Sequence, residues 1–158
     1  MSLKPLKAFE TLLDKEVLRP DPVQTEAMTN LQALDNELVN YAKQMGQSGW
    51  LARLGLAGSR MDPPKGIYLY GGVGRGKTML MDLFYDHCSV DDGQKQHVHF
   101  HSFMQEVHRR LHTFRKAKRL GNINSDRDGV KALAKIISDR AWLLCFDEFH
   151  VNDIADAM

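Results

Sequence analysis

One glycine-rich stretch constrains the fold more than any other part of this chain. Residues 71–78 read GGVGRGKT, which fits the pattern G-x-x-x-x-G-K-[S/T] without a mismatch. An apolar run at 67–70 precedes the stretch, and a helical pattern over 77–87 follows it. Glycines at these spacings permit a tight turn between a strand and a helix. The sequence therefore predicts a strand, a compact loop and a helix in immediate succession.

The residue types in this Walker A loop match the chemistry of phosphate binding. Where glycine removes the side chain, backbone N–H groups can turn toward phosphate oxygens, and the following helix N-terminus adds partial positive charge. We expect the Lys77 ammonium to reach the β- and γ-phosphates of a nucleotide, and the Thr78 hydroxyl to bind Mg²⁺. Arg75 is expected to point to solvent or to a neighbouring subunit. The predicted nucleotide-binding residues are Gly71, Gly72, Val73, Gly74, Arg75, Gly76, Lys77 and Thr78. A glycine-rich turn that binds nothing is the alternative, and the match at every required position disfavours it.

A pair of acidic residues follows a second apolar run and predicts the other half of a catalytic site. Residues 143–146 read as a buried strand, with Asp147 and Glu148 at its carboxyl end. Ligands of parallel α/β sheets bind at that edge. Asp147 would hold Mg²⁺ through a water molecule, and Glu148 would polarise the attacking water as general base. Alone, such a pair is commonly a solvated strand end. After a complete phosphate-binding loop it indicates a Walker B motif and nucleoside triphosphate hydrolysis, with Glu148 and Lys77 as catalytic residues.

The remaining pattern predicts two regions within 158 residues. Asp21 and Pro22 open an amphipathic helix that we expect to end at Gly46, and a shorter helix precedes it. Residues 46–65 read as a linker, so we place a boundary near residue 60. Residues 1–60 then form an N-terminal helical segment and linker, and residues 61–158 form an α/β domain. Within this domain we expect a strand at 97–101, a helix from Ser102 to Arg119, and a helix near 130–137, which together favour a parallel sheet with flanking helices.

Four sequence segments resemble the ZapE family of AAA-type ATPases over nearly the whole chain. They are RPDPVQTEAMTNLQAL, GIYLYGGVGRGKTMLMDLFY, VHFHSFMQEVHRRL and FHVNDIADAM. Bacterial members of the family are cell-division ATPases associated with the division ring, and the related AFG-type ATPases are mitochondrial. The resemblance implies an AAA-type P-loop NTPase fold, ATP and Mg²⁺ as ligands, and a homo-oligomer in which a neighbour's arginine completes each site. It further implies hydrolysis coupled to remodelling of a protein partner, such as a division-ring component.

Family members continue well beyond the last residue given, so the resemblance implies a truncated domain, incomplete at its C-terminus. In AAA-type folds a further strand lies between the two that carry the Walker motifs. We therefore expect the strands at 67–70 and 143–146 to lack a neighbour, which would make these 158 residues unstable and incomplete for turnover.

Other signals are weaker. His97, His99 and His101 alternate along a predicted strand, which raises the possibility of a metal site as an alternative to a polar strand face.

A basic run on the helix that ends at Arg119 raises the possibility of a nucleic-acid-linked ATPase, such as a helicase loader, although a solvated helix face is the commoner interpretation. A binding module without turnover is a third alternative. Tyr68 and Tyr70 are expected to lie in the core rather than to stack on the bases of a nucleic acid.

Targeting and redox signals favour the cytoplasm. The N-terminal stretch lacks the apolar core of a signal peptide and carries several acidic residues, which are rare in transit peptides. Two cysteines far apart in sequence indicate a reducing compartment rather than a disulfide framework. The net charge of +1 favours no class of partner, and peripheral membrane association stays open.

Overall fold

The computed structural model describes residues 3–53, 62–121 and 128–149. These residues form two compact units, Met1–Val90 and Asp91–Met158, each of which is described by itself. The predicted boundary near residue 60 lies outside the described residues. The described helices include none that is long and apolar enough to cross a lipid bilayer.

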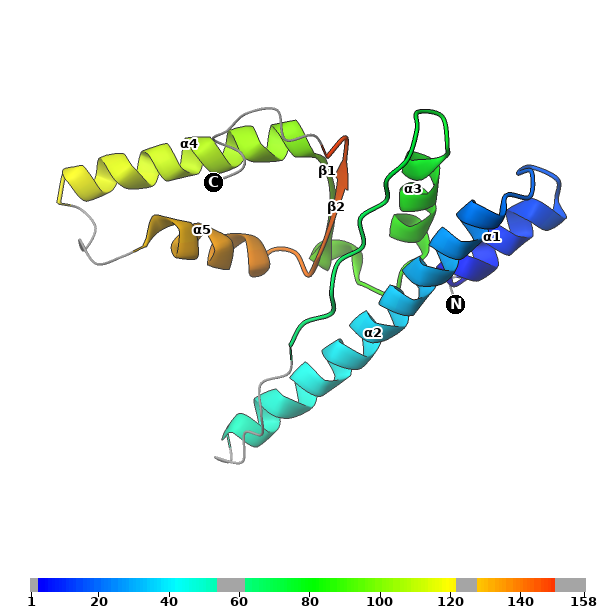
Figure 1. The fold of residues 1–158 in the computed structure, drawn as a ribbon. Helices are drawn as coiled ribbons and strands as arrows, with labels where there is room; N and C mark the ends of the chain where they lie inside the picture. Colours follow the sequence, from blue (N-terminus) through cyan, green and yellow to red (C-terminus); the bar gives the residue numbers. More distant parts are fainter. Residues whose placement is uncertain (1–2, 54–61, 122–127, 150–158) are drawn as a thin grey trace. The chain divides into compact units, whose positions relative to one another are not determined.

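Among its described residues, the first unit has three helices, drawn in Figure 1, and their buried apolar side chains form one core. The helices are α1 (Pro5–Asp14), α2 (Pro22–Arg53) and α3 (Lys77–His87). Both α1 and α2 pack against α3, and Phe9 and Phe84 are almost completely buried at this junction. Of the apolar stripe that predicted an amphipathic helix, Leu31, Leu34 and Leu38 are buried in this core, whereas Val23 is exposed. Met28, which lies outside the predicted stripe, is buried as well.

The start of α2 confirms the predicted cap, because the Asp21 carboxylate accepts a hydrogen bond from Val23 N at 2.9 Å. Its end differs from the prediction. The helix continues through Gly46 to Arg53, since a glycine inside a helix costs only about 1 kcal/mol and does not by itself terminate it. The predicted linker at 46–65 is therefore helical over its first residues.

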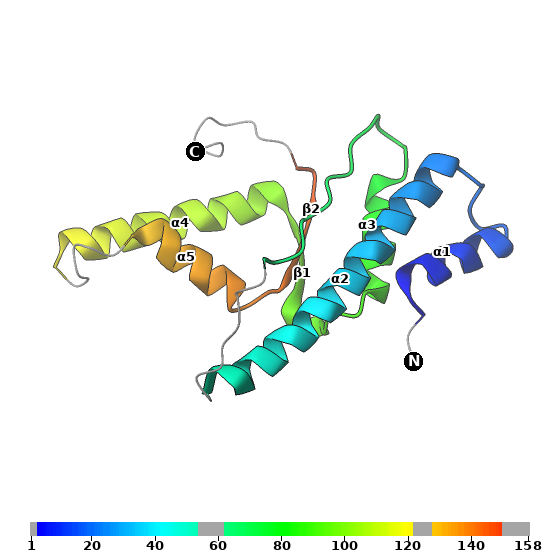
Figure 2. The same cartoon turned by 60° about the horizontal axis from the view of Figure 1, so that its bottom comes forward.

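Among its described residues, the second unit has a parallel sheet of two strands, β1 (Lys95–His99) and β2 (Leu143–Asp147), and two α-helices, α4 (Phe100–Arg119) and α5 (Gly129–Ser138) (Figure 2). The strands run in register from Lys95 opposite Leu143 to His99 opposite Asp147. Helix α4 packs against α5 and against the first strand. Phe146, on the second strand, lies edge-on to Phe103 of α4, with ring centroids 4.9 Å apart. A short 3₁₀ helix, η1 (Asp92–Gln94), directly precedes β1.

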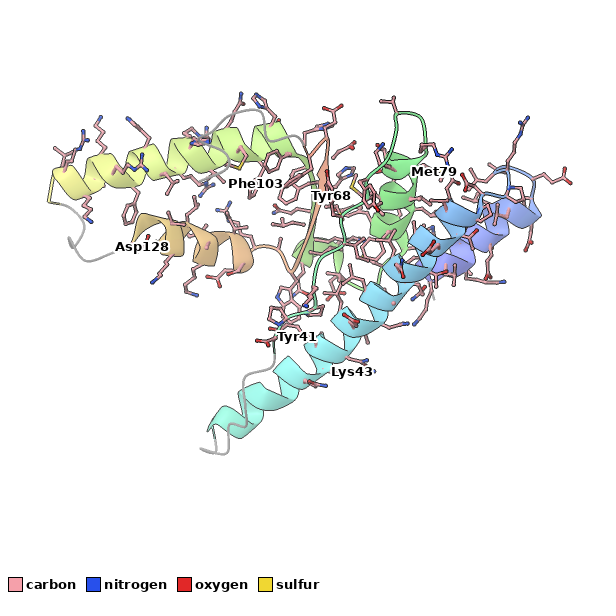
Figure 3. The ribbon with its side chains drawn as sticks, viewed as in Figure 1. Tyr41, Lys43, Tyr68, Met79, Phe103 and Asp128 are labelled. Atoms are coloured by element: carbon pink, nitrogen blue, oxygen red, sulfur yellow. The ribbon has the colours of Figure 1, made fainter. Side chains whose placement is uncertain are left out.

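Side chains explain two of these boundaries (Figure 3). Asp128, labelled at the start of α5, accepts hydrogen bonds from Val130 N and Lys131 N and so caps the helix. By contrast, α4 begins at Phe100 rather than at Ser102, and His99 precedes it without a side-chain cap. Phe100 is buried against the ring of Phe146, so tertiary packing sets this boundary in place of the local capping signal.

Two expectations about the strands are wrong. The Asp-Glu strand does have a neighbour, because β2 pairs in parallel with β1. Residues 67–70 are not assigned as a strand, and the sheet of the described residues consists of β1 and β2. Tyr68 and Tyr70 were expected in the core, yet they are 66% and 85% exposed with their rings stacked on each other.

Candidate nucleotide-binding site

The glycine-rich loop runs directly into α3 and uses backbone conformations that favour glycine. Gly74 has φ +76° and Gly76 has φ +79°, both in the left-handed region. Gly76 is the N-cap of α3, so this conformation turns the chain into the helix. The loop residues from Gly71 to Arg75 are exposed. The loop thus presents its backbone to solvent at the positive end of a helix, where anions are favoured.

The side chain of Lys77 lies over this loop. Its ammonium donates hydrogen bonds to the carbonyl oxygens of Gly71 at 3.0 Å and Gly72 at 2.8 Å. These bonds hold the positive charge beside the backbone that is predicted to surround the phosphates. Thr78 follows in the first turn of α3 and is exposed. The ammonium, the helix terminus and the hydroxyl are therefore gathered within one short segment.

Two residues at the start of α2, the preceding Asp21 and Gln24 in the first turn, contact the loop, and the sequence interpretation missed both contacts. The Gln24 amide nitrogen donates a hydrogen bond to Arg75 O at 3.2 Å. The Asp21 carboxylate lies 3.6 Å from the Arg75 guanidinium. Arg75, expected to face solvent or another subunit, is partly exposed and paired within its own unit. Asp21 and Gln24 were interpreted only as capping signals. No local sequence pattern indicates a contact with a residue more than 50 positions away.

The acidic pair lies at the carboxyl end of β2, as its sequence position predicted. Asp147 is the last residue of the strand, and its carboxylate accepts a hydrogen bond from Glu148 N at 3.0 Å. Glu148 is exposed and has φ +52°, a conformation that non-glycine residues adopt rarely and that is often found at functional positions. The parallel register places His99 directly opposite Asp147. The loop belongs to the first unit and the acidic pair to the second.

The three histidines considered for a metal site do not share a strand face. His97 and His99 lie on β1, whereas His101 lies in the first turn of α4. The His101 ring instead forms a hydrogen bond with the Gln105 side chain at 3.0 Å. Residues 3–53, 62–121 and 128–149 contain no group of three or more histidine, cysteine or acidic side chains placed to hold a metal ion.

These features define a class of protein: a truncated α/β fold of the P-loop NTPase type, with helices N-terminal to the loop. A family model described as AFG1-like ATPase matches residues 3–158. The chain belongs to the AFG1-like ATPase family.

Relatives from bacteria and eukaryotes agree with this assignment. The chain is 39% identical over 163 aligned residues to the cell division protein ZapE of Escherichia coli K12, an alignment that covers 99% of this chain and 40% of the relative. It is 48% identical over 103 residues to lactation elevated protein 1 homolog B of Danio rerio, covering 63% of this chain and 20% of that one. An uncharacterized protein of Schizosaccharomyces pombe is 33% identical over 98% of this chain and 38% of its own length. The chain thus spans well under half the length of these relatives. No solved structure matches it.

Proposed function

We propose that this chain binds ATP through the loop at 71–78 and supplies the catalytic residues for ATP hydrolysis by the whole protein. The observation that carries the proposal is the position of Lys77, whose ammonium is held over the loop by the carbonyl oxygens of Gly71 and Gly72. A fixed cation at a helix N-terminus, beside exposed backbone N–H groups, suits a polyphosphate. Membership of the AFG1-like ATPase family supports ATP as the nucleotide.

Each side chain has a separate role in this proposal. The loop backbone and Lys77 bind and orient the phosphates, which lowers the entropic cost of reaching the reactive geometry. Glu148 accepts a proton from the attacking water. Thr78 and Asp147 are the residues that would hold Mg²⁺. Their oxygen donors are the type that this ion prefers, and both side chains retain some solvent access. The bound ion would neutralise charge on the phosphates.

The proposal for the cellular role is supported by the relatives alone. Because a relative that aligns with the full chain is a cell division protein, we propose that hydrolysis remodels a protein partner during cell division in the cytoplasm. We further propose that the whole protein forms a homo-oligomer. A nucleic-acid-linked ATPase is the competing function, and exposed basic residues near the end of α4 are the feature that would serve it: Arg115, Lys116, Lys118 and Arg119. Stimulation of turnover by single-stranded DNA, lost steeply as salt rises, would favour the competitor.

The experiment compares ATP turnover and MgADP binding by the whole protein and by point variants. We expect Lys77→Ala to weaken MgADP binding severely. Glu148→Gln should bind normally and fail to hydrolyse. Lys43→Ala and Glu37→Gln are matched controls, because they make the same changes at exposed positions of α2. Equal turnover and binding in all five proteins would refute the proposal.

A further inference from the structure

Helix α2 contacts the chain on both sides of α3. In the first turn of α2, the Gln24 amide donates to Arg75 O, two residues before α3 begins. Farther along, the Asp35 carboxylate accepts hydrogen bonds from Ser89 N at 2.6 Å and Ser89 Oγ at 2.9 Å, two residues after α3 ends. Helix α2 therefore fixes the segments that enter and leave the helix following the loop.

The spacing of these two contacts matches the length of α3. Gln24 and Asp35 are 11 residues apart in sequence, and α3 itself has 11 residues. At 1.5 Å per residue both spans are about 16 Å. A single rigid helix can therefore hold both segments without bending. Asp35 is fully buried whereas Ser89 is exposed, so the two bonds between them are partly shielded from competing water.

The contact at the loop is close as well as polar. A Cβ atom added to Gly76 would lie 2.9 Å from the Gln24 amide nitrogen, so the amide stands directly against the turn that leads into α3. The neighbouring pair of Asp21 and Arg75 adds little, because both side chains are partly exposed and 3.6 Å apart. Of the contacts from α2 to the loop, the Gln24 hydrogen bond is the one that fixes backbone position.

We propose that Gln24 is a positioning residue for the nucleotide. By holding the Arg75 carbonyl, it keeps the last turn of the loop in the conformation that directs backbone N–H groups toward the phosphates, while Asp35 fixes the far end of α3. A loop rich in glycine has many alternative conformations, and a ligand that binds only one of them loses affinity in proportion to its population. This inference rests on the proposed function, since it assumes that the loop binds the phosphates.

The variant that isolates this role is Gln24→Met in the whole protein. Methionine has nearly the same length and volume but cannot donate a hydrogen bond, so packing is retained while the bond to Arg75 O is lost. We expect MgADP to bind about threefold to tenfold more weakly, the range that loss of one hydrogen bond allows. Amide hydrogen exchange should become faster at residues 72–76. Gln24→Glu, which has the same shape but places a carboxylate against the carbonyl, should lose more affinity.

The matched control is Gln44→Met, the same substitution at an exposed position of α2 about 30 Å farther along the helix. It should bind MgADP as the wild type does. If Gln24→Met binds like the wild type while Lys77→Ala does not bind, the inference is overturned and the proposed function stands. If wild type and Lys77→Ala bind equally, the proposed function itself fails.

Hydrogen exchange separates positioning from a merely structural role. Should Gln24→Met lower the thermal midpoint as well as the affinity, the location of the faster exchange decides the matter. Faster exchange confined to residues 72–76 supports positioning. Faster exchange that extends equally to α1, which does not contain the contact, overturns the inference.

Discussion

Replacing Gly76 with alanine tests the geometry of the loop most directly. The residue has φ +79°, where a side chain costs about 1–2 kcal/mol. The new Cβ would lie 2.9 Å from the Gln24 amide nitrogen and 3.5 Å from Met79 Cε. The Gln24 side chain is flexible and would move away. Its hydrogen bond to Arg75 O would then be lost, at a cost of about 0.5–1.5 kcal/mol. The nucleotide-binding conformation should therefore become about 1.5–3.5 kcal/mol less favourable.

The assay is calorimetric titration of the whole protein with MgADP. Because the free loop can relax to another conformation but must return to bind, the penalty appears as weaker affinity, roughly 10- to 300-fold at 1.4 kcal/mol per tenfold change. Gly66→Ala is the control. Its new methyl group would meet nothing within 4 Å, and Gly66 has no positive φ, so its affinity should stay within twofold of the wild type. Binding by Gly76→Ala within threefold of the wild type would refute the reasoning.

Three further predictions concern stability, each measured as the change in free energy of unfolding from urea denaturation. Asp35→Ala removes the acceptor of both Ser89 hydrogen bonds and should cost about 2–3 kcal/mol, whereas Asp35→Asn, which keeps one acceptor, should cost less. Asp128→Ala removes the cap of α5 and should cost about 1 kcal/mol. Phe146→Ala leaves a cavity beside the Phe103 ring and should cost about 3 kcal/mol, with Phe146→Leu retaining most of the stability.

The controls for these predictions are exposed residues of the same type. Asp86→Ala on α3 and Asp139→Ala after α5 should each change the free energy of unfolding by less than about 0.5 kcal/mol. If Asp86→Ala and Asp35→Ala are equally destabilising, loss of the hydrogen bonds between Ser89 and Asp35 is not the cause. If Asp128→Ala is neutral, the observed cap does not support α5.

Local signals predicted the elements that local interactions determine. The helix at 77–87 was predicted with the bounds that the structure has, because a glycine turn sets its start and the apolar pattern sets its face. The cap at Asp21 is confirmed for the same reason. The boundary between β1 and α4 was misplaced, since burial of Phe100 outweighs the capping signal at Ser102.

Contacts between distant residues could not be predicted from the sequence. The bonds from Gln24 to Arg75 and from Asp35 to Ser89 join residues more than 50 positions apart. Their residue types, glutamine and serine, are common on any helix or loop. The sequence identified the loop residues and the acidic pair, whose spacing follows the chemistry of phosphate and metal binding. It did not identify the support behind the loop, because many side chains could provide such support.

The core shared by α1, α2 and α3 has a consequence for dividing this protein into fragments. Phe84, on the helix that follows the loop, is buried in the core to which Phe9 and Met28 also belong. A recombinant fragment that starts just before the loop would expose this ring and remove Gln24 and Asp35 together. Residues 3–53 therefore cannot be removed without exposing this core. For expression or fusion, the smallest fragment that preserves the loop begins before Pro5. Mutational screens of nucleotide affinity should therefore include the residues of α1 and α2.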